Sequence, residues 1–471
     1  MRSTASGGNG ISFGRVNFRG EVAGRVKMSF CPECPPQVWR AARFGGCILC
    51  TLFVLGGTLP AAERPATASA IALAREAVAA AENQDFATYM AKMEDAVALR
   101  PDFPRLLVNL AAAQVANEKP DEAIATLERL AALGLNSPVE KSEDFTALRE
   151  RRDFQAVVRK LAGNLQARGP GHIAFTLREV TGLIEGIAWR EKTGDFFFGD
   201  VNGRAVWRRG PDGTLHRLTG ESDELFGVFG LAVDEARGAL WAATSAVPAM
   251  RGFSPEMDGT AALVEIDLDS GAVRRVVPVV RRPGDRGSHV LGDLVVAADG
   301  SVFVTDSGAP LIWRLDSSGA LEPLIESPEF MSLQGIVALP GGDQLLVADH
   351  ANGLLEVDLS SRMVRRLESP ANTTLIGLDG IALAPNGDLL AIQNGLRPTR
   401  ILRLQLRGSG TEVTEVQVLE SGHLTMAAPS LGCIGPDGQF FYIGNAGWTR
   451  FENSDASASA PRAVPIFRTR L

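Results

Sequence analysis

The sequence predicts a mainly β protein, a six-bladed β-propeller preceded by an all-α domain. A strand–turn–strand pattern recurs six times within residues 172–471. An alanine-rich stretch with apolar residues three and four positions apart, typical of helices, occupies residues 63–165. At 471 residues the chain is long enough for two or three domains.

Residues 1–62 have the features of a secretory signal. The apolar run at 45–57 is shorter than the about 20 residues that span a bilayer. Arg40 and Arg43 precede it, and small residues follow it as far as Ala62. We therefore expect cleavage near Ala62, a periplasmic or secreted mature chain, and no stable membrane span after cleavage. An uncleaved signal anchor is the alternative, and Met28 would be the more usual start for such a signal.

The cysteines do not predict a metal site or a disulfide. Cys31, Cys34, Cys47 and Cys50 superficially resemble a four-thiolate zinc site. Cys47 and Cys50 lie inside the apolar part of the signal, however, which disfavours that interpretation. Only Cys433 remains after cleavage, in an apolar strand where a free cysteine packs as a small hydrophobic residue.

The helical stretch at 63–165 resembles a short tetratricopeptide array. The segment 95–101 is similar to the segment 129–135, at an offset of 34 residues, the tetratricopeptide period. A closing helix is expected around 142–161, and 166–171 is expected to be a linker. Two interpretations stay open: the helices bind a protein partner on a concave face, or they dock on the propeller and cover it.

The propeller prediction rests on six similar segments. Each has a small residue, an apolar run, a turn with glycine and a second apolar run; they are 185–200, 229–245, 292–307, 334–350, 379–394 and 430–445. Corresponding positions in successive segments are 44, 63, 42, 45 and 51 residues apart, spacings typical of propeller blades. Strands near 173–177 and 464–471 are expected to share one blade and close the ring, which removes an exposed edge.

The first residues of the six inner strands are expected to form a ring at one mouth of the channel, because these strands run in the same direction. In blade order they are Glu185, Phe229, Gly292, Gln334, Asp379 and Ser430. The second strands return to the same end and bring Asp200, Ser245, Asp306, Asp349, Asn394 and Asn445 to the rim. Oxygen ligands of this kind predict a site for a hard divalent cation.

The segments 185–189, 293–306, 334–349 and 379–394 resemble the repeats of the gluconolactonase/regucalcin (senescence marker protein) family. The strictosidine-synthase-like and paraoxonase propellers are more distant relatives. The resemblance implies a central divalent cation, Ca²⁺ in the first place with Zn²⁺ or Mg²⁺ as alternatives, which polarises a lactone and activates water. It implies Glu185 and Asp379 as ligands, Gln334 in place of the usual asparagine, and Asp379 as general base. Gly292 leaves the blade-three position without a ligand.

Further residues are candidates for substrate binding at the same mouth. They are Asn394, Asp349, His350, Arg397 and Asp306, with His289 and Trp448 as additional rim residues. Hydration or pairing with arginine is the alternative role for Glu185 and Asp379. The long second interval leaves an insertion at 247–258, which is expected either to cover the mouth or to form an outer loop.

These observations predict an exported, metal-dependent hydrolase of the lactonase type, acting on a small lactone or sugar-like molecule. The alternative is a non-catalytic binding or scaffold propeller whose helices recruit a protein partner. The formal net charge of −8 and the absence of a basic cluster exclude a nucleic-acid-binding class. The sequence has no nucleophile elbow, phosphate-binding loop or dinucleotide fingerprint.

Overall fold

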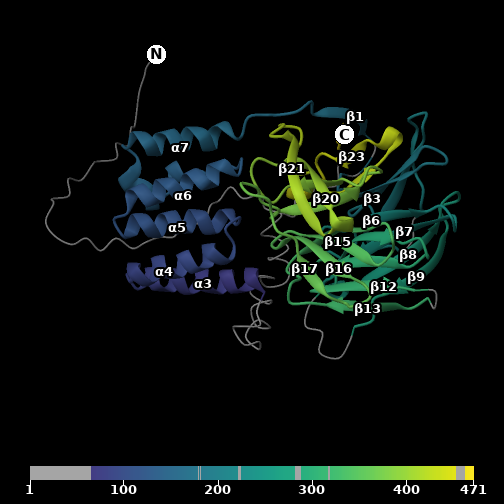
Figure 1. The fold of residues 1–471 in the computed structure, drawn as a ribbon. Helices are drawn as coiled ribbons and strands as arrows, with labels where there is room; N and C mark the ends of the chain where they lie inside the picture. The colour runs from purple at the N-terminus through teal and green to yellow at the C-terminus, as the bar shows by residue number, and fades with distance from the viewer. Residues whose placement is uncertain are drawn as a thin grey trace, which may run out of the picture.

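The computed structural model describes residues 65–178, 180, 182–220, 224–281, 288–316, 319–451 and 462–470. A stack of helices lies beside a ring of β-sheets (Figure 1). The expected signal at 1–62, its cleavage site and four of the cysteines lie outside the described residues. Within the described residues, no helix is both long enough and apolar enough to cross a membrane, and Cys433 is free.

The N-terminal domain consists of two helix hairpins and a closing helix. Its elements are α3 (Ala66–Glu82), α4 (Phe86–Leu99), α5 (Pro104–Ala116), α6 (Pro120–Ala132), the short 3₁₀ helices η2 (Val139–Lys141) and η3 (Glu143–Leu148), and α7 (Arg152–Gly163). Proline occupies the first position of α5 and of α6, where its missing amide proton is not needed. A single buried core that includes Met93, Leu107 and Leu127 joins the hairpins. The two hairpins agree with the expected helical domain, and its assignment to the tetratricopeptide class stays a prediction.

The expected closing helix at 142–161 is divided into η3 and α7. The chain turns between them, where the Arg151 amide donates to the Leu148 carbonyl at 2.9 Å. The turn lets Phe145 of η3 and Phe154 of α7 both reach the core, with ring centroids 6.1 Å apart. The packing of these two rings therefore accounts for the break between η3 and α7.

Six four-stranded antiparallel sheets form the propeller, which confirms the predicted number of blades. Blades one to three contain β2 (Ile184–Arg190), β3 (Asp195–Asp200), β4 (Ala205–Arg209), β5 (Leu215–Arg217), β6 (Gly227–Asp234), β7 (Ala239–Ser245), β8 (Ala261–Asp267), β9 (Val273–Pro278), β10 (Leu291–Val296), β11 (Val302–Asp306), β12 (Leu311–Leu315) and β13 (Leu321–Glu326). Blades four and five contain β14 (Leu333–Ala338), β15 (Gln344–Asp349), β16 (Gly353–Asp358), β17 (Val364–Arg366), β18 (Leu378–Leu383), β19 (Leu389–Gln393), β20 (Arg400–Arg407) and β21 (Glu412–Ser421).

Blade six closes the ring with strands from both ends of the propeller. It contains β22 (Gly432–Ile434), β23 (Phe440–Ile443), β24 (Val464–Thr469) and β1 (His172–Leu177), in the order β1-β24-β23-β22. β1 pairs antiparallel with β24, with Thr176 opposite Pro465. The expected closure is confirmed, and the shared blade ties the start of the propeller to its end.

The helical domain is docked on the propeller through buried polar contacts. Arg100 is 1% exposed and donates to Asn352 Oδ1, in the loop between β15 and β16, at 3.0 Å. It also pairs with Asp102 at 3.1 Å, and Asp102 accepts a hydrogen bond from Ser369 at 2.9 Å. A buried arginine with these partners is a strong constraint, because removing one partner leaves a charge buried.

Further contacts connect the helices to blade five. Arg400 donates to the Leu133 carbonyl at 2.9 Å, and the Asn136 amide donates to the Arg397 carbonyl at 2.7 Å. Leu396 packs against the helical core. The contacting loops follow second strands or precede third strands, so they lie at the same end of the blades as the first residues of the inner strands. Of the two roles considered for the helices, docking on the propeller is what the structure shows.

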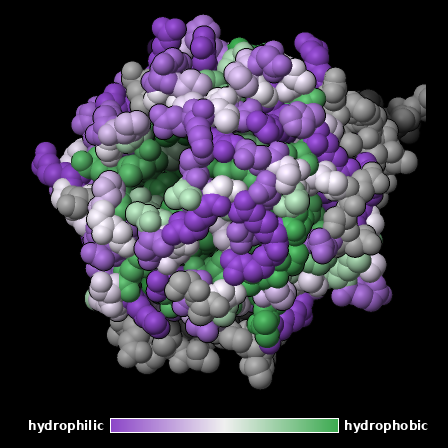
Figure 2. All heavy atoms as spheres, turned by 90° about the vertical axis from the view of Figure 1, so that its right-hand side faces the viewer, coloured by the Kyte–Doolittle hydropathy of each residue, from purple (hydrophilic) through white to green (hydrophobic). Residues whose placement is uncertain are grey.

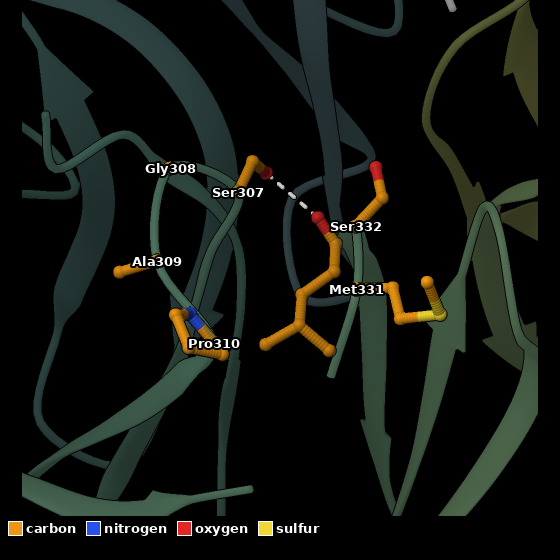
Figure 3. A pocket seen from close by; sticks show the side chains of 7 residues that line it. Ser307, Gly308, Ala309, Pro310, Met331 and Ser332 are labelled. Carbon is orange, nitrogen blue, oxygen red and sulfur yellow. Dashed lines mark hydrogen bonds between the residues drawn. The ribbon is translucent and has the colours of Figure 1, made fainter. Parts of the chain in front are cut away.

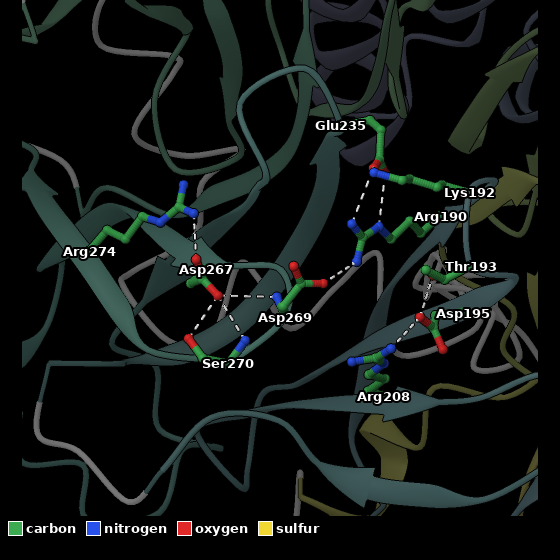
Figure 4. Close-up of polar contacts among 10 residues, drawn as sticks. All are labelled: Arg190, Lys192, Thr193, Asp195, Arg208, Glu235, Asp267, Asp269, Ser270 and Arg274. Carbon is green, nitrogen blue, oxygen red and sulfur yellow. Dashed lines mark hydrogen bonds and ion pairs between the residues drawn. The ribbon is translucent and has the colours of Figure 1, made fainter.

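Ion pairs cluster at the end of the first two blades that lies away from the first residues of the inner strands (Figure 4). Arg190, at the end of β2, pairs with Glu235 at 2.8 Å and with Asp269 at 2.6 Å, both in blade two. Asp195, at the start of β3, pairs with Arg208 at 2.6 Å. Seen from the side turned away from the helices, the surface mixes hydrophilic side chains, which cross its middle, with apolar ones, and shows no single broad apolar face (Figure 2).

Candidate functional site

The first residues of the inner strands lie at β-bulges. In five blades the pairing of the inner strand with its neighbour shifts register at this point, between Ile184/Gly186, Val228/Leu231, Leu291/Leu294, Leu333/Ile336 and Leu378/Ile381. A bulge leaves a residue outside the ladder and redirects its side chain. A β-bulge is therefore repeated at the corresponding position of five blades, around one mouth of the channel.

Close contact between neighbouring inner strands explains the glycine that follows each of two ring acids. A Cβ atom at Gly186 would lie 1.9 Å from the Phe229 carbonyl oxygen of the next blade. A Cβ atom at Gly380, after Asp379, would lie 2.7 Å from the Ser430 carbonyl oxygen. Blade three differs, because Asp293 occupies the corresponding position and its carboxylate accepts a hydrogen bond from the Ile336 amide of blade four at 3.3 Å.

Three carboxyl groups act on one another at this mouth: Glu185 of blade one, Asp293 of blade three and Asp379 of blade five. Burial raises the pKa of Glu185 to about 8, and the charges of Asp379 and then Asp293 add to the effect. Burial raises the pKa of Asp293 to about 7, with a smaller contribution from the charge of Asp379. Burial raises the pKa of Asp379 to about 6, although its hydrogen bond with Asn394 opposes the rise. The three groups therefore share one electrostatic environment.

Neighbouring side chains orient two of these acids. The Trp448 indole Nε1 donates to Glu185 Oε2 at 2.9 Å. Asn394 Nδ2 donates to Asp379 Oδ2 and, at 2.8 Å, to the Pro429 carbonyl. His350 Nε2 lies 3.0 Å from Asn394 Oδ1, and burial lowers the pKa of His350, which favours its neutral form. Hydrogen bonds thus join Asp379, Asn394 and His350, and Glu185 lies close enough for the charge of Asp379 to raise its pKa. The roles of these residues stay predictions.

Gln334 lies on the blade-four side of the mouth and is half-buried. Its Nε2 donates to the Ser332 hydroxyl at 3.3 Å. Beside it, a cavity of about 20 Å³ lies between blades three and four (Figure 3). The cavity has room for about one water molecule. The Ser307 hydroxyl, which lines it, donates to the Leu333 carbonyl at 2.7 Å.

Asp306 and Asp349 are fully buried, and their oxygens have several hydrogen-bond donors. Asp349 accepts from four backbone amides, those of Met331, Ser332, Ala351 and Asn352, at 2.7–2.9 Å. Asp306 accepts from the Val290 and Gly308 amides and the Trp313 indole at 3.0 Å, and lies 2.6 Å from His289 Nδ1. These contacts organise the loops behind the mouth, and substrate contact by either acid stays a prediction.

Arg397 lies at the contact between blade five and the helices. Its side chain is exposed, and its carbonyl accepts the hydrogen bond from Asn136. A role in substrate binding stays a prediction for this residue.

Sequence reasoning missed the contribution of Asp293. The repeat alignment contained a signal, because Asp293 corresponds to glycine in blades one, two, four and five. Its neighbour Gly292 was assigned to the ring and lacks a side chain. The bulge spans both residues, so blade three also supplies an acid to the mouth.

The oxygen-bearing side chains at the mouth are of the types that bind a hard divalent cation, although the acids are not arranged as a preformed metal site. Glu185, Asp379 and the Gln334 amide oxygen are of the kind that Ca²⁺ takes. Among the described residues, no three His, Cys, Asp or Glu side chains are grouped closely enough to hold a metal ion. A cation would therefore be held by these two carboxylates, completed by amide and water oxygens. Asn394 is already engaged, since its oxygen faces His350 and its nitrogen faces Asp379.

The blade-two side of the mouth is apolar. Phe229, the ring residue of this blade, packs with Trp448 at a ring-centroid distance of 6.1 Å. Val247 and Ala249 of the insertion between β7 and β8 pack in the same cluster. The start of the insertion therefore packs beside the ring residue of blade two, and covering of the mouth by the insertion stays a prediction.

No protein-family model matches the sequence, and no curated protein matches it. Several solved structures are similar to this chain. A gluconolactonase from Xanthomonas campestris is 16% identical, with a TM-score of 0.44, covering 65% of this chain and 98% of its own. The calcium-binding protein regucalcin from Agrobacterium tumefaciens is 13% identical, with a TM-score of 0.44, covering 64% and 95%. Virginiamycin B lyase from Staphylococcus aureus is 15% identical, with a TM-score of 0.40, covering 57% and 80%. At these identities the similarity concerns the fold.

Proposed function

We propose that this chain is an exported, metal-dependent hydrolase that opens lactones at the mouth of the propeller. The observation that carries the proposal is the convergence of Glu185, Asp293 and Asp379 on one mouth. None of the three is paired with lysine or arginine in the ion pairs of the described residues. Buried acids without such partners are a frequent property of catalytic and cation-binding sites.

Asp379 is suited to act as general base. The pKa of about 6 leaves it mostly ionised at neutral pH yet basic enough to accept a proton from water. Asn394 holds one of its oxygens by a hydrogen bond. In the proposed reaction Asp379 takes a proton from a water molecule as the water oxygen bonds to the lactone carbonyl carbon. The ring C–O bond then breaks, and Asp379 returns the proton to the departing ring oxygen, which gives a hydroxy acid.

Glu185, Gln334 and Asp379 are the proposed cation ligands, for Ca²⁺ in the first place and for Zn²⁺ or Mg²⁺ as alternatives. A cation bound there would polarise the ester carbonyl and lower the pKa of water. Trp448 fixes the orientation of Glu185 by its hydrogen bond to Oε2. Burial raises the pKa values of all three acids, and the charge of Asp379 adds to the rise at Glu185 and Asp293. A positive charge between them would therefore also stabilise their ionised forms.

Export is proposed from the sequence of residues 1–62. N-terminal sequencing of protein recovered from the periplasm or the medium tests it, with a new N-terminus near Ala62 as the expected result. An intact N-terminus in the membrane fraction would instead support the signal-anchor alternative.

A second candidate is a non-catalytic binding protein, whose helices recruit a protein partner. The position of the helices is the reason to consider it, because Arg100 and Asn136 hold them at the same end of the blades as the acids. A domain in that position could present a propeller-bound ligand to a partner without any reaction.

Hydrolysis of a panel of neutral lactones, followed with a pH indicator in the presence of Ca²⁺, Zn²⁺ or Mg²⁺, separates the two candidates. The Asp379→Asn variant should lose at least about 100-fold in kcat, the usual range for loss of a general base. Asp343→Asn, at an exposed aspartate between β14 and β15, is the matched control and should keep wild-type activity. A wild type that opens no lactone with any of the three cations would leave the binding-protein alternative.

A further inference from the structure

We infer that the lactone taken by this mouth is neutral and carries an apolar alkyl or aryl substituent. The substituent lies against an apolar wall formed by Phe229, Val247, Ala249 and Trp448, of which the half-buried Val247 and Trp448 present the accessible surface. This inference deepens the proposed function and rests on it. It concerns the substrate class and the side of the mouth that recognises it.

The wall is built from three separate segments that meet at one place. Phe229 comes from the bulge of the inner strand of blade two, and Trp448 from the loop between β23 and β24 in blade six. Val247 and Ala249 come from the insertion after β7. Phe229 is also the only aromatic residue at the six ring positions. An apolar residue there departs from the pattern of acids and amides in blades one, four and five.

Trp448 connects the wall to the carboxylates. Its indole nitrogen lies 2.9 Å from Glu185 Oε2, and its ring packs on Phe229. A group lying against this indole therefore lies next to the proposed reacting carbonyl. The substituent recognised by the wall should be attached close to the lactone ring.

The charges at the mouth disfavour an anionic substrate. Glu185, Asp293 and Asp379 are all acidic, and the main charges acting on Glu185 are those of the other two. A bound cation would offset the charges of its two proposed ligands, Glu185 and Asp379, but Asp293 is not among the ligands, so a negative charge on the substrate would still be repelled at the mouth. A neutral lactone avoids this repulsion.

The wall also disfavours a polyhydroxylated lactone. The side chains of Phe229, Val247 and Ala249 have no hydrogen-bond donor or acceptor, and the indole donor of Trp448 is already bound to Glu185. Hydroxyl groups placed there would lose water without gaining a partner. An alkyl or aryl group gains from the same surface in proportion to the apolar area it buries.

Binding of lactams, which resist hydrolysis, tests this inference without relying on catalysis. The probes are a phenyl-substituted γ-lactam and the polyhydroxylated lactam that corresponds to gluconolactone, each titrated calorimetrically into the wild type. We expect the phenyl lactam to bind at least about tenfold more tightly, which corresponds to about 1.4 kcal/mol. Trp448→Ala should abolish this preference. Trp448→Phe is the matched control, because it keeps an aromatic ring in the wall, and it should keep most of the preference.

The outcomes separate this inference from the proposed function. Preferential binding of the phenyl lactam that depends on the Trp448 ring, in a protein that opens no lactone, would support the apolar subsite and refute the hydrolase. Hydrolysis of lactones with equal or tighter binding of the polyhydroxylated lactam would refute the apolar subsite alone. Absence of binding by both lactams in the wild type also overturns the inference. The wild-type comparison keeps it testable if Trp448→Ala fails to fold.

Discussion

Replacing Asp379 by asparagine should stabilise the cation-free protein, although the same change should abolish hydrolysis. The ordinary pKa of this carboxyl group is 3.8, and burial raises it to about 6 in the folded protein. Each pKa unit corresponds to about 1.4 kcal/mol, so ionised Asp379 weakens folding by about 3 kcal/mol at pH 8. The asparagine oxygen can still accept the hydrogen bond from Asn394. Stabilisation of about 1–3 kcal/mol is therefore expected, in line with a functional site that lowers stability.

The pH dependence has a definite sign. A carboxyl group whose folded-state pKa is raised leaves stability unaffected below its unfolded pKa and lowers it as pH rises toward the folded value. The wild type should therefore lose stability between about pH 4 and pH 8, since Glu185 extends the window to its pKa of about 8. The advantage of Asp379→Asn should be largest at pH 8, about half as large at pH 5, and absent well below pH 4.

Thermal unfolding in a chelator at pH 8 and pH 5 measures this effect. At about 2 °C per kcal/mol, Asp379→Asn should raise Tm by about 2–6 °C at pH 8 and by about half as much at pH 5. Asp343→Asn should leave Tm unchanged at both pH values. With millimolar Ca²⁺ the order should reverse at pH 8, because only the wild type keeps both carboxylate ligands. A variant that is no more stable than the wild type at pH 8, or equally stabilised at both pH values, would refute the reasoning.

Three further predictions concern the ring, the cation and the helices. Gly186→Ala should cost more than about 3 kcal/mol or prevent folding, because its Cβ would lie 1.9 Å from a backbone oxygen; Gly220→Ala, with no atom within 4 Å, should be neutral by urea denaturation. Affinity for Ca²⁺ should rise between pH 6 and pH 8 in calorimetric titrations with proton release, because Glu185 must lose its proton to bind; a pH-independent affinity would contradict this. Arg100→Ala should destabilise the docked helices by about 3–5 kcal/mol and make the segment 166–171 sensitive to limited proteolysis, whereas unchanged protection would argue against a docking role.

The repeat pattern of the sequence was sufficient to predict the propeller. Each of the six inner strands begins within two residues of the start of its predicted segment, and β1 and β24 share a blade as expected. The pattern is strong because each blade repeats the same alternation and the same glycine turn. The two helix hairpins were also expected, from the spacing of apolar residues. Division of the closing helix was not, since the contact between Phe145 and Phe154 depends on tertiary packing.

The candidate site was only partly predictable. Glu185, Asp379 and Asn394 lie together because their positions in the repeat place them at one mouth. Asp293 was missed because a bulge redirects side chains in a way that alternation along a strand does not reveal. Asp349 was expected at the rim, but the hydrogen bonds that its carboxylate accepts from four backbone amides of the neighbouring loops were not expected. Such loop amides cannot be located from sequence spacing.

The docking of the helices could not be predicted from the sequence either, because it depends on contacts between residues that are far apart in the chain. The hydrogen bond between Arg100 and Asn352 joins residues 252 positions apart. Arg100 belongs to the repeated segment 95–101, but nothing in that repeat indicates a contact with Asn352. The sequence pattern therefore allowed both docking and a free peptide-binding face. Only the burial of Arg100 at the contact distinguishes them.

Calorimetric titration of Ca²⁺ into the wild type and into Asp379→Ala tests the central claim most directly, since the claim is that the acids at the propeller mouth form one cation-binding site. The wild type should bind one equivalent, and the variant should bind at least about tenfold more weakly, a loss of about 1.4 kcal/mol. A wild type that binds no Ca²⁺, Zn²⁺ or Mg²⁺, or a variant that binds as tightly as the wild type, would contradict the account.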